Sequence, residues 1–252
     1  MSAESVKQVM PDIPITVFSD ELIESPYINE CVIVDPATDP AEYPIKYLTE
    51  TPYSRTIYLD SDTYISEPIF ELFEVLDSFD MGIVMDPIHS NISNDTSDTP
   101  ACFPMFNTGL IAFRECERIM DLFKQWLANF REYDSKTDQK AFRNAVYDSG
   151  VQFVTLGPEY NCLYGAYPGY LNGSVKVFHG RLVDTTGFKG LRKKYAPSKT
   201  RKVLNSTSQP RVYTHGNGIR VHTDSKCLKF IHLIRNWGIK DSLNELASYI
   251  RK

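Results

Sequence analysis

The sequence predicts an α/β fold, in which helices flank a mixed, mainly parallel sheet. Short apolar runs bounded by turn residues alternate with segments of helical period, which is typical of a layered α/β domain. The chain has 252 residues, of which 42% are hydrophobic, enough to bury a sizeable core. These two observations favour one domain with a smaller appendage.

The first predicted strands lead to an acidic motif. Residues 13–18 and 55–59 are short runs suited to strands, and the second run ends directly before Asp60. Ser66 can cap a helix, because an acidic residue and a proline follow it and apolar residues then recur at helical spacing over residues 69–76. This helix is expected to pack against the sheet.

The middle of the chain continues the alternation around a polar loop. Strands are expected at 81–85 and 106–113, and the residues between them (87–104) are too polar and too many for a mere connector. Loops of this kind tend to carry substrate contacts. The next helix has one apolar stripe, interpreted as core, that consists of Ile119, Leu122, Phe123, Trp126, Leu127 and Phe130.

The last third of the chain is expected to change character. A helix that begins near Thr137 precedes a strand at 151–156. Residues 187–209 are basic, poor in large apolar side chains and interrupted by Pro197, which predicts a mobile lid or linker. Residues 228–250 are expected to form two short helices.

Charge is distributed unevenly between the two parts of the chain. Residues 1–188 hold 12 Lys and Arg against 29 Asp and Glu, a net charge of −17, whereas residues 189–252 hold 15 against 3, a net charge of +12. The basic segment indicates an anionic partner, which is a diphosphate, an anionic lipid surface or the acidic body of the protein itself.

Several classes of protein do not fit the composition. No window approaches 18 consecutive apolar residues, and residues 1–10 have neither a basic leader nor an apolar stretch. Five scattered cysteines without a CxxC pair fit neither a disulfide framework nor a zinc cluster. We expect a cytoplasmic protein with no nucleic-acid partner. Weak peripheral contact of residues 189–252 with the inner face of the membrane is compatible with its charge.

The strongest candidate for chemistry is the pair Asp60 and Asp62. Alternate side chains of an extended backbone share a face, so both carboxylates can point at one place beyond the end of strand 55–59. Oxygen ligands of this kind suit Mg²⁺ or Mn²⁺, and ligands bind at the carboxyl edge of open α/β sheets. The alternative is a solvated turn, which an isolated Asp-x-Asp triplet more often is.

The surrounding sequence resembles a known family. The run Arg-Thr-Ile-Tyr-Leu-Asp-Ser-Asp-Thr-Tyr-Ile at 55–65 is similar to the hallmark of GT-A-fold glycosyltransferases, above all the glycogenin and lipopolysaccharide galactosyltransferase relatives (family 8-like). Four further segments resemble that group in the same order, namely 106–110 (Phe-Asn-Thr-Gly-Leu), 138–139 (Asp-Gln), 160–161 (Tyr-Asn) and 178–180 (Phe-His-Gly). Five ordered patterns are more specific than any single one.

The resemblance implies a metal site and a sugar site. Asp60, Asp62 and His179 correspond to the ligands of Mn²⁺ or Mg²⁺, although His179 by itself also fits a core or loop histidine. Asp138 and Gln139 are the catalytic candidates and contact the transferred sugar. The substrate-binding candidates are Asn107, Thr108, Gly109, Asn161, Gly180 and Arg181.

Some of these residues have a plain structural alternative. Asn107 and Asn161 fit residues that satisfy backbone groups at strand ends, and Asp138 with Thr137 fits a helix cap.

The implied reaction transfers a sugar from a UDP-, GDP- or TDP-linked donor to a glycan or lipid-linked acceptor, with retention. The metal acts as a Lewis acid on the diphosphate, and cations of the basic segment can close over it. Arg181 is the best-placed cation because it follows Gly180. Looser candidates are Lys189, Arg192, Lys193 and Lys194.

The chain departs from the family at both ends. Relatives begin with a strand and loop that hold the nucleotide, whereas only twelve residues precede strand 13–18 here, so the first strand is expected to be missing. Residues 5–10 then form the end of the first helix. We expect residues 1–188 to form a shortened GT-A-like catalytic domain and residues 189–252 a basic lid or linker with C-terminal helices.

Two other functions remain open. One is a catalytically silent binding module that keeps the fold without donor affinity. The other is a sugar nucleotidyltransferase, although such enzymes show a Gly-rich basic loop near the start that is not seen here.

Overall fold

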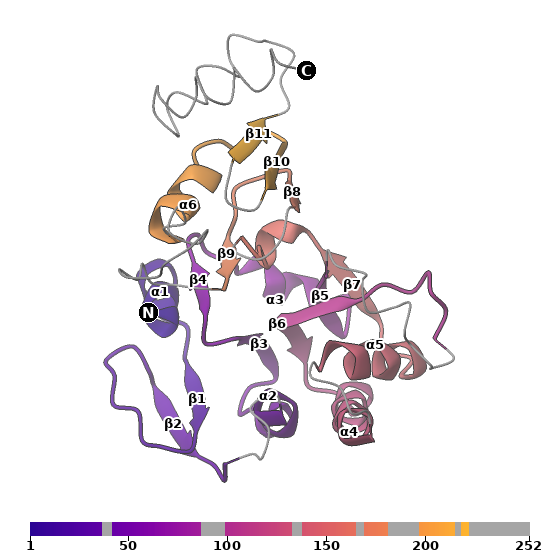
Figure 1. The fold of residues 1–252 in the computed structure, drawn as a ribbon. Coiled ribbons are helices and arrows are strands. Elements are labelled where there is room, and N and C mark those ends of the chain that lie inside the picture. The colour runs from indigo at the N-terminus through magenta and orange to yellow at the C-terminus, as the bar shows by residue number, and fades with distance from the viewer. Residues whose placement is uncertain are drawn as a thin grey trace, which may run out of the picture.

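The computed structural model describes residues 1–36, 42–86, 99–132, 138–164, 169–180, 197–214 and 218–221. Its centre is a four-stranded sheet in the order β3–β6–β5–β7 (Figure 1). The strands are β3 (Arg55–Leu59), β6 (Phe106–Arg114), β5 (Met81–Met85) and β7 (Phe153–Leu156). The predicted α/β class with a mixed sheet is confirmed.

Three strands of this sheet run in one direction, and one is reversed. β5 pairs in parallel with β7, whereas β6 runs antiparallel to both of its neighbours, β3 and β5. The expectation of a mixed, mainly parallel sheet therefore agrees with the directions of β3, β5 and β7, and the reversed β6 was not predicted. The alternation of apolar runs and helices reports the type of each element, but it carries no information on the direction of a strand.

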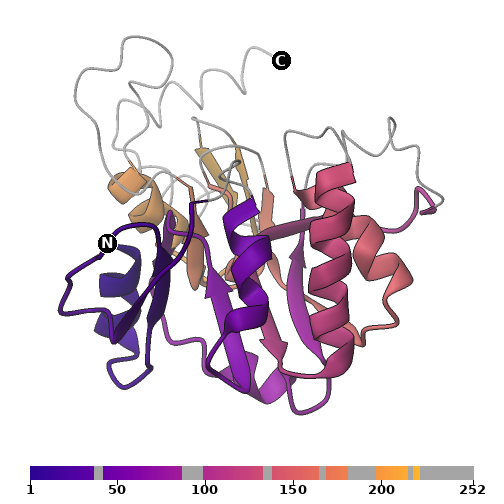
Figure 2. The same ribbon diagram turned by 90° about the horizontal axis from the view of Figure 1, so that it is seen from below.

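The central strand β6 is buried on both faces because helices cover both sides of the sheet. Ile111 and Phe113 face α2 (Glu42–Tyr47), α4 (Glu117–Glu132) and α5 (Gln139–Asp148), and the three helices lie side by side in Figure 1 and Figure 2. Leu110 and Ala112 face the opposite cluster, which includes residues of α1 (Ser2–Val9) and α3 (Glu71–Val75). Because successive side chains of β6 point to opposite faces of the sheet, this strand contributes to both cores.

The predicted apolar stripe of α4 is largely confirmed. Ile119, Leu122, Phe123, Trp126 and Phe130 are buried in the core, whereas Leu127 is only partly buried at its edge. Edge-on aromatic pairs connect this helix to β6 and α5, among them the contact of Trp126 with Phe142.

Three smaller sheets surround the central one. β1 (Thr16–Ser19) pairs in parallel with β2 (Glu30–Ile33). β4 (Thr63–Ile65) pairs antiparallel with β9 (Val177–His179), and β10 (Arg211–Thr214) lies between β8 (Gly169–Leu171) and β11 (Gly218–Val221). Short 3₁₀ turns at Leu48–Glu50 and Pro158–Tyr160 and the helix α6 (Pro197–Leu204) complete the described elements.

The predicted helix cap at Ser66 is wrong. The helix α3 begins at Glu71, and the Ser66 hydroxyl instead donates a hydrogen bond of 2.5 Å to the carbonyl of Val175. Ser66 continues the connection between β4 and β9, since its N–H bonds the carbonyl of Lys176. A cap signal is local, and here a partner more than a hundred residues away takes the hydroxyl.

Part of the predicted lid is an ordered helix. Pro197 begins α6, and Val203 and Leu204 are buried in a small core with Phe178 and Tyr213. A proline is compatible with the first turn of a helix, so it did not mark a break there. Residues 187–196 and the predicted helices within 228–250 lie outside the described residues, and so do residues 87–98 of the polar loop.

The division of the chain at residue 188 stays a prediction. Among the described residues, β8 and β10 lie on either side of this boundary and pair with each other. α1 ends at Val9, which agrees with the helix end expected at residues 5–10. The expectation of a missing first strand is not tested. No helix among the described residues is long and apolar enough to cross a bilayer.

Candidate active site

Two carboxylates stand at the end of β3, in the turn that leads to β4. The turn is fixed by Thr63, whose N–H and hydroxyl both donate to the carbonyl of Asp60. The N–H of Asp60 in turn bonds the carbonyl of Gly109 in β6. The side chains of Asp60 and Asp62 keep 34% and 53% of their surface exposed, so a ligand can reach both.

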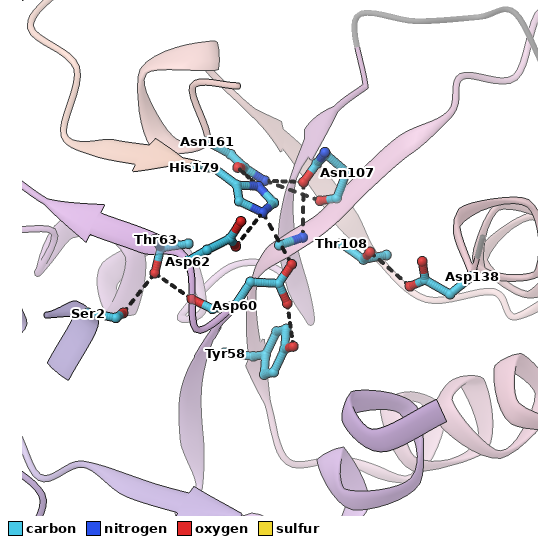
Figure 3. Close-up of polar contacts among 11 residues, drawn as sticks. Ser2, Tyr58, Asp60, Asp62, Thr63, Asn107, Thr108, Asp138, Asn161 and His179 are labelled. Carbon is cyan, nitrogen blue, oxygen red and sulfur yellow. Dashed lines mark hydrogen bonds and ion pairs between the residues drawn. The ribbon is translucent and has the colours of Figure 1, made fainter. Parts of the chain in front are cut away.

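His179 reaches these carboxylates because β9 pairs with β4. Thr63 lies opposite His179 in this antiparallel pair, as Figure 3 shows, although 116 residues separate the two in the chain. The imidazole Nε2 lies 3.3 Å from Asp60 Oδ2 and 3.2 Å from Asp62 Oδ1. One ligand atom from each of the three residues falls within 4.8 Å of the others. The structure thus brings together the three expected metal ligands.

The charges at this point are strongly coupled. Burial disfavours the charged imidazole, but hydrogen bonds to Asp60 and Asp62 prevail and raise the pKa of His179 to about 9. The hydrogen bond from His179 in turn holds the pKa of Asp62 below its usual value. Two carboxylates with one imidazole nitrogen attract positive charge to the point between them, and this donor set fits Mn²⁺ or Mg²⁺.

Tyr58 supports Asp60 and was missed by the sequence analysis. Its hydroxyl donates a hydrogen bond of 2.5 Å to Asp60 Oδ1 (Figure 3). Burial raises the pKa of Tyr58 well above its usual value, and the neighbouring Asp60 charge adds to the effect, so the hydroxyl stays a donor. Tyr58 lies on β3 and Asp60 directly follows this strand, two positions later, and this spacing is a signal that the sequence does contain.

Two buried asparagines lie behind His179. The Asn161 amide Nδ2 donates to Asn107 Oδ1 over 2.7 Å, and Asn161 Oδ1 lies 2.9 Å from His179 Nδ1. Asn107 Oδ1 also accepts the N–H of Gly109 over 3.0 Å. The side chains are linked in series, from the backbone of β6 to the imidazole (Figure 3).

Gly109 is needed for close packing. A Cβ at this position would lie 2.1 Å from Cε1 and 2.5 Å from Nδ1 of His179, which is too close for any real contact. The imidazole therefore rests directly on the backbone of β6. Gly109 is predicted from the sequence to bind substrate, and its contact with His179 is a second, steric reason for a glycine here.

Asp138 lies at the start of α5 and faces Thr108. The Thr108 hydroxyl donates to Asp138 Oδ2 over 2.9 Å, and burial raises the pKa of Asp138 to about 6. The side chain makes no capping hydrogen bond to α5, which speaks against the helix-cap alternative. Gln139 is the first residue of α5 and is partly exposed.

Gly180 closes the site after β9. Its φ of +111° is a conformation that favours glycine, and its N–H bonds the carbonyl of Asp62. Arg181 and the basic residues Lys189, Arg192, Lys193 and Lys194 lie outside the described residues.

A cavity of about 1470 Å³ connects the site to the space between β1 and β3. Asp60, Asp62, Thr108 and Asp138 line one end, and residues 13–19 and 53–59 line the other. The cavity is larger than the range of about 300–1000 Å³ that is usual for ligand pockets, so its volume does not exclude a large ligand.

Comparison with protein families decides the class. A family model described as nucleotide-diphospho-sugar transferase matches residues 48–228, more than half of the chain. The chain belongs to the nucleotide-diphospho-sugar transferase family. The match includes Asp60, Asp62 and His179. The predicted class, a glycosyltransferase that uses nucleotide sugars, is confirmed, and the family disfavours the nucleotidyltransferase alternative. No curated protein matches this transferase in sequence.

Solved structures with weak similarity to this transferase are also sugar transferases. An active-site mutant of LgtC aligns over 71% of this chain and 80% of its own, with 16% identity and a TM-score of 0.48. The galactosyltransferase LgtC in complex with donor and acceptor sugar analogues aligns over 64% and 69%, with 16% identity and a TM-score of 0.45. Mouse xyloside xylosyltransferase 1 aligns over 55% and 62%, with 19% identity and a TM-score of 0.41. Since these TM-scores lie below 0.5, the family assignment rests on the family model.

Proposed function

We propose that this transferase binds a nucleotide-diphosphate sugar with a divalent cation held by Asp60, Asp62 and His179. The observation that carries the proposal is the meeting of these three side chains, from two segments far apart in the chain, at one point beside the cavity. A metal site requires such a convergence of ligand atoms.

The donor atoms support Mn²⁺ or Mg²⁺ at this point. Both carboxylates are partly exposed, so coordination positions remain for phosphate oxygens and water. When bound, such an ion supplies Lewis-acid stabilisation of the departing diphosphate. The protein side chains do the rest by holding the donor in place and by keeping its reacting end next to Asp138.

Asp138 is proposed to hold the transferred sugar. Its carboxylate lines the cavity together with Thr108, and the Thr108 hydroxyl already fixes its orientation. An ionised carboxylate accepts hydrogen bonds from sugar hydroxyls, and these bonds are stronger than those between neutral groups. Gln139, the next residue, supplies an amide near the same place and is proposed as its partner in catalysis.

Asn107 is proposed to contribute one donor to the sugar. Its Oδ1 accepts two hydrogen bonds within the protein, while the described part of the chain offers no acceptor for its Nδ2. Thr108, Gly180 and Arg181 complete the proposed substrate site, with Arg181 as a cation for the diphosphate.

The stereochemistry and the acceptor are proposed from the resemblance. Transfer with retention needs no strong enzymic base, because the leaving phosphate itself can take the acceptor's proton. The acceptor is a glycan or a lipid-linked sugar, and the basic residues 189–252 are proposed to give weak contact with an anionic membrane surface.

The test is calorimetric titration of UDP-, GDP- and TDP-sugars into the protein, with Mn²⁺ and then with EDTA. We expect one donor to bind only with metal, and the hydrolysis or transfer of its sugar to follow. Asp62→Ala should abolish this binding, whereas Asp77→Ala, which changes an exposed aspartate outside the site, should leave it intact. Unchanged donor affinity in Asp62→Ala contradicts the proposal, and no binding of any donor favours the silent module.

A further inference from the structure

The asparagine pair Asn107 and Asn161 is almost fully buried behind the candidate metal ligands. Only 3% of Asn107 and 4% of Asn161 is exposed, and their amides touch each other and His179. Asparagine amides are seldom buried unless hydrogen bonds satisfy them. The directions of these bonds decide what the pair does.

The backbone N–H of Gly109 determines which atom donates and which accepts in every hydrogen bond from Asn107 to His179. The backbone N–H of Gly109 can only donate, so the atom of Asn107 that it meets must be the oxygen Oδ1. The Asn161 atom that contacts this oxygen must then be its nitrogen, Nδ2. The other amide atom of Asn161, which faces His179 Nδ1, is consequently the oxygen. An amide oxygen only accepts, so Nδ1 of His179 carries a hydrogen.

The opposite ring nitrogen faces the carboxylates. Nε2 of His179 points at Asp60 and Asp62 over 3.3 and 3.2 Å. When a cation takes the place of the hydrogen on Nε2, the hydrogen fixed on Nδ1 leaves the Nε2 lone pair as the ligand, directed between the two carboxylates. This is the arrangement that a metal-binding histidine needs, and a group that fixes the second ring nitrogen also fixes the plane of the ring.

An irregularity in the pairing of β5 with β6 leaves the N–H of Gly109 available as this donor. Ile83 of β5 lies opposite Ile111, but the next residue, Val84, lies opposite Asn107, so residues 108–110 of β6 have no partner in β5. The N–H of Gly109 is therefore free of the β5 ladder and bonds the Asn107 side chain instead. The irregularity also places the bare backbone of Gly109 under the imidazole.

We propose that Asn107 and Asn161 are positioning residues, which keep the hydrogen on Nδ1 of His179 and so present Nε2 as a ligand to a divalent cation. Asn161 has both polar atoms of its amide engaged in this role, so it acts on the cation through His179. The inference rests on the proposed function, because it needs a cation at Asp60 and Asp62.

The first readout of the test is the dissociation constant of Mn²⁺ alone, measured on the full chain by calorimetry or electron paramagnetic resonance. Asn161→Ala should weaken Mn²⁺ binding roughly 10- to 100-fold, as other losses of outer-shell partners do. Asn107→Ala should weaken Mn²⁺ binding as well, because Asn161 Nδ2 loses its acceptor. Asn129→Ala is the matched control, since it removes an amide that is similarly buried (7% exposed) away from the site.

The second readout does not depend on metal. In nitrogen-edited proton spectra of the metal-free protein, the Nδ1–H of His179 should be visible, because a buried hydrogen bond protects it from exchange. It should disappear in Asn161→Ala and persist in Asn129→Ala. A general loss of stability would not separate the variants in this way.

The outcomes separate this inference from the proposed function. If the wild-type chain binds Mn²⁺ and Asn161→Ala binds it equally well, or if the Nδ1–H signal survives in Asn161→Ala, the inference is wrong while the metal site stands. If the wild-type chain binds no Mn²⁺, the proposed metal dependence fails, and the inference fails with it.

Discussion

The imidazole of His179 lies where a side chain on Gly109 would be. A Cβ on Gly109 would stand 2.1 Å from Cε1 of the ring, well inside any allowed contact. The proposed metal-ligand histidine and the glycine of β6 are therefore packed against each other, and each restricts what the other position can hold.

We predict that Gly109→Ala displaces His179. The added methyl group must push the ring away from Asp60 and Asp62, so Mn²⁺ binding should weaken by a factor of about 100 or more. Overpacking should also lower stability by roughly 1–3 kcal/mol. Calorimetry with Mn²⁺ and thermal unfolding measure the two effects.

Gly82→Ala in β5 is the control for this change. Its Cβ would meet only the Leu156 side chain, at 3.3 Å or more, and that chain can shift. Metal binding should be unaffected there. Wild-type Mn²⁺ affinity in Gly109→Ala contradicts the packing argument.

Tyr58→Phe removes the hydroxyl that holds Asp60. The carboxylate loses its short hydrogen bond and gains freedom to rotate, so we expect roughly 10-fold weaker Mn²⁺ binding with little change in fold. Tyr147→Phe, at an exposed position on α5, is the matched control. The prediction is contradicted by equal Mn²⁺ affinities in the two variants.

Asp138 should make stability depend on pH in a defined direction. Its pKa in the folded protein is about 6, against an ordinary value of 3.8, because burial disfavours its charge. Because the pKa of Asp138 is higher in the folded protein, protonation of its carboxyl stabilises the folded state fully below pH 3.8. This stabilisation is lost as the pH rises through 6. Asp138→Asn cannot ionise, so it should be more stable than the wild type at pH 8, by about 1–3 kcal/mol, and equally stable near pH 3.5.

Urea unfolding of both proteins at the two pH values measures this difference. Binding of the nucleotide-sugar donor should change with pH in the opposite sense, since the ionised carboxylate of Asp138 is the proposed sugar contact. It should weaken in the wild type below pH 6 and be weak at all pH values in Asp138→Asn. If the two proteins differed in stability by the same amount at both pH values, ionisation of Asp138 would be excluded as the cause.

Asp80 is predicted to be a main electrostatic determinant of stability. Its fully buried carboxylate binds Arg114 and Arg118 at 2.7 and 2.8 Å and accepts the N–H of Gln152. Burial alone would raise its pKa, but the hydrogen bonds, first that of Arg114, hold it below its usual value. Because the pKa of Asp80 is lower in the folded protein than in the unfolded chain, its ionised carboxylate stabilises the folded state at pH values above the unfolded pKa. This stabilisation is lost as the pH falls through the folded pKa.

Asp80→Ala should therefore cost roughly 1–3 kcal/mol at pH 7, since the N–H of Gln152 and two arginines lose their acceptor. The exposed pair of Asp77 with Arg55 provides the comparison, and Asp77→Ala should cost less than about 1 kcal/mol. Chemical denaturation of the three proteins at pH 7 and at pH 3 decides the point. Equal costs for the two substitutions would show that the cluster contributes little.

The sequence determined what depends on near neighbours in the chain. β3 and β5 were predicted with their observed bounds, and the stripe of α4 was predicted nearly residue by residue, because alternation and helical period are set by adjacent positions. The placement of Asp60 and Asp62 beyond β3 follows from the same local pattern. Resemblance to a family added His179, which no local pattern connects to them.

Only the tertiary structure decided what depends on distant partners. Pairing of β4 with β9 sets His179 against Asp60 and Asp62, the register shift of β6 releases the Gly109 N–H, and Val175 takes the hydroxyl of Ser66. The directions of the strands likewise depend on partners that are distant in the chain. Each of these features is a contact between segments that the chain order leaves unrelated, and the free energy of packing and of buried hydrogen bonds selects among them only in the folded state.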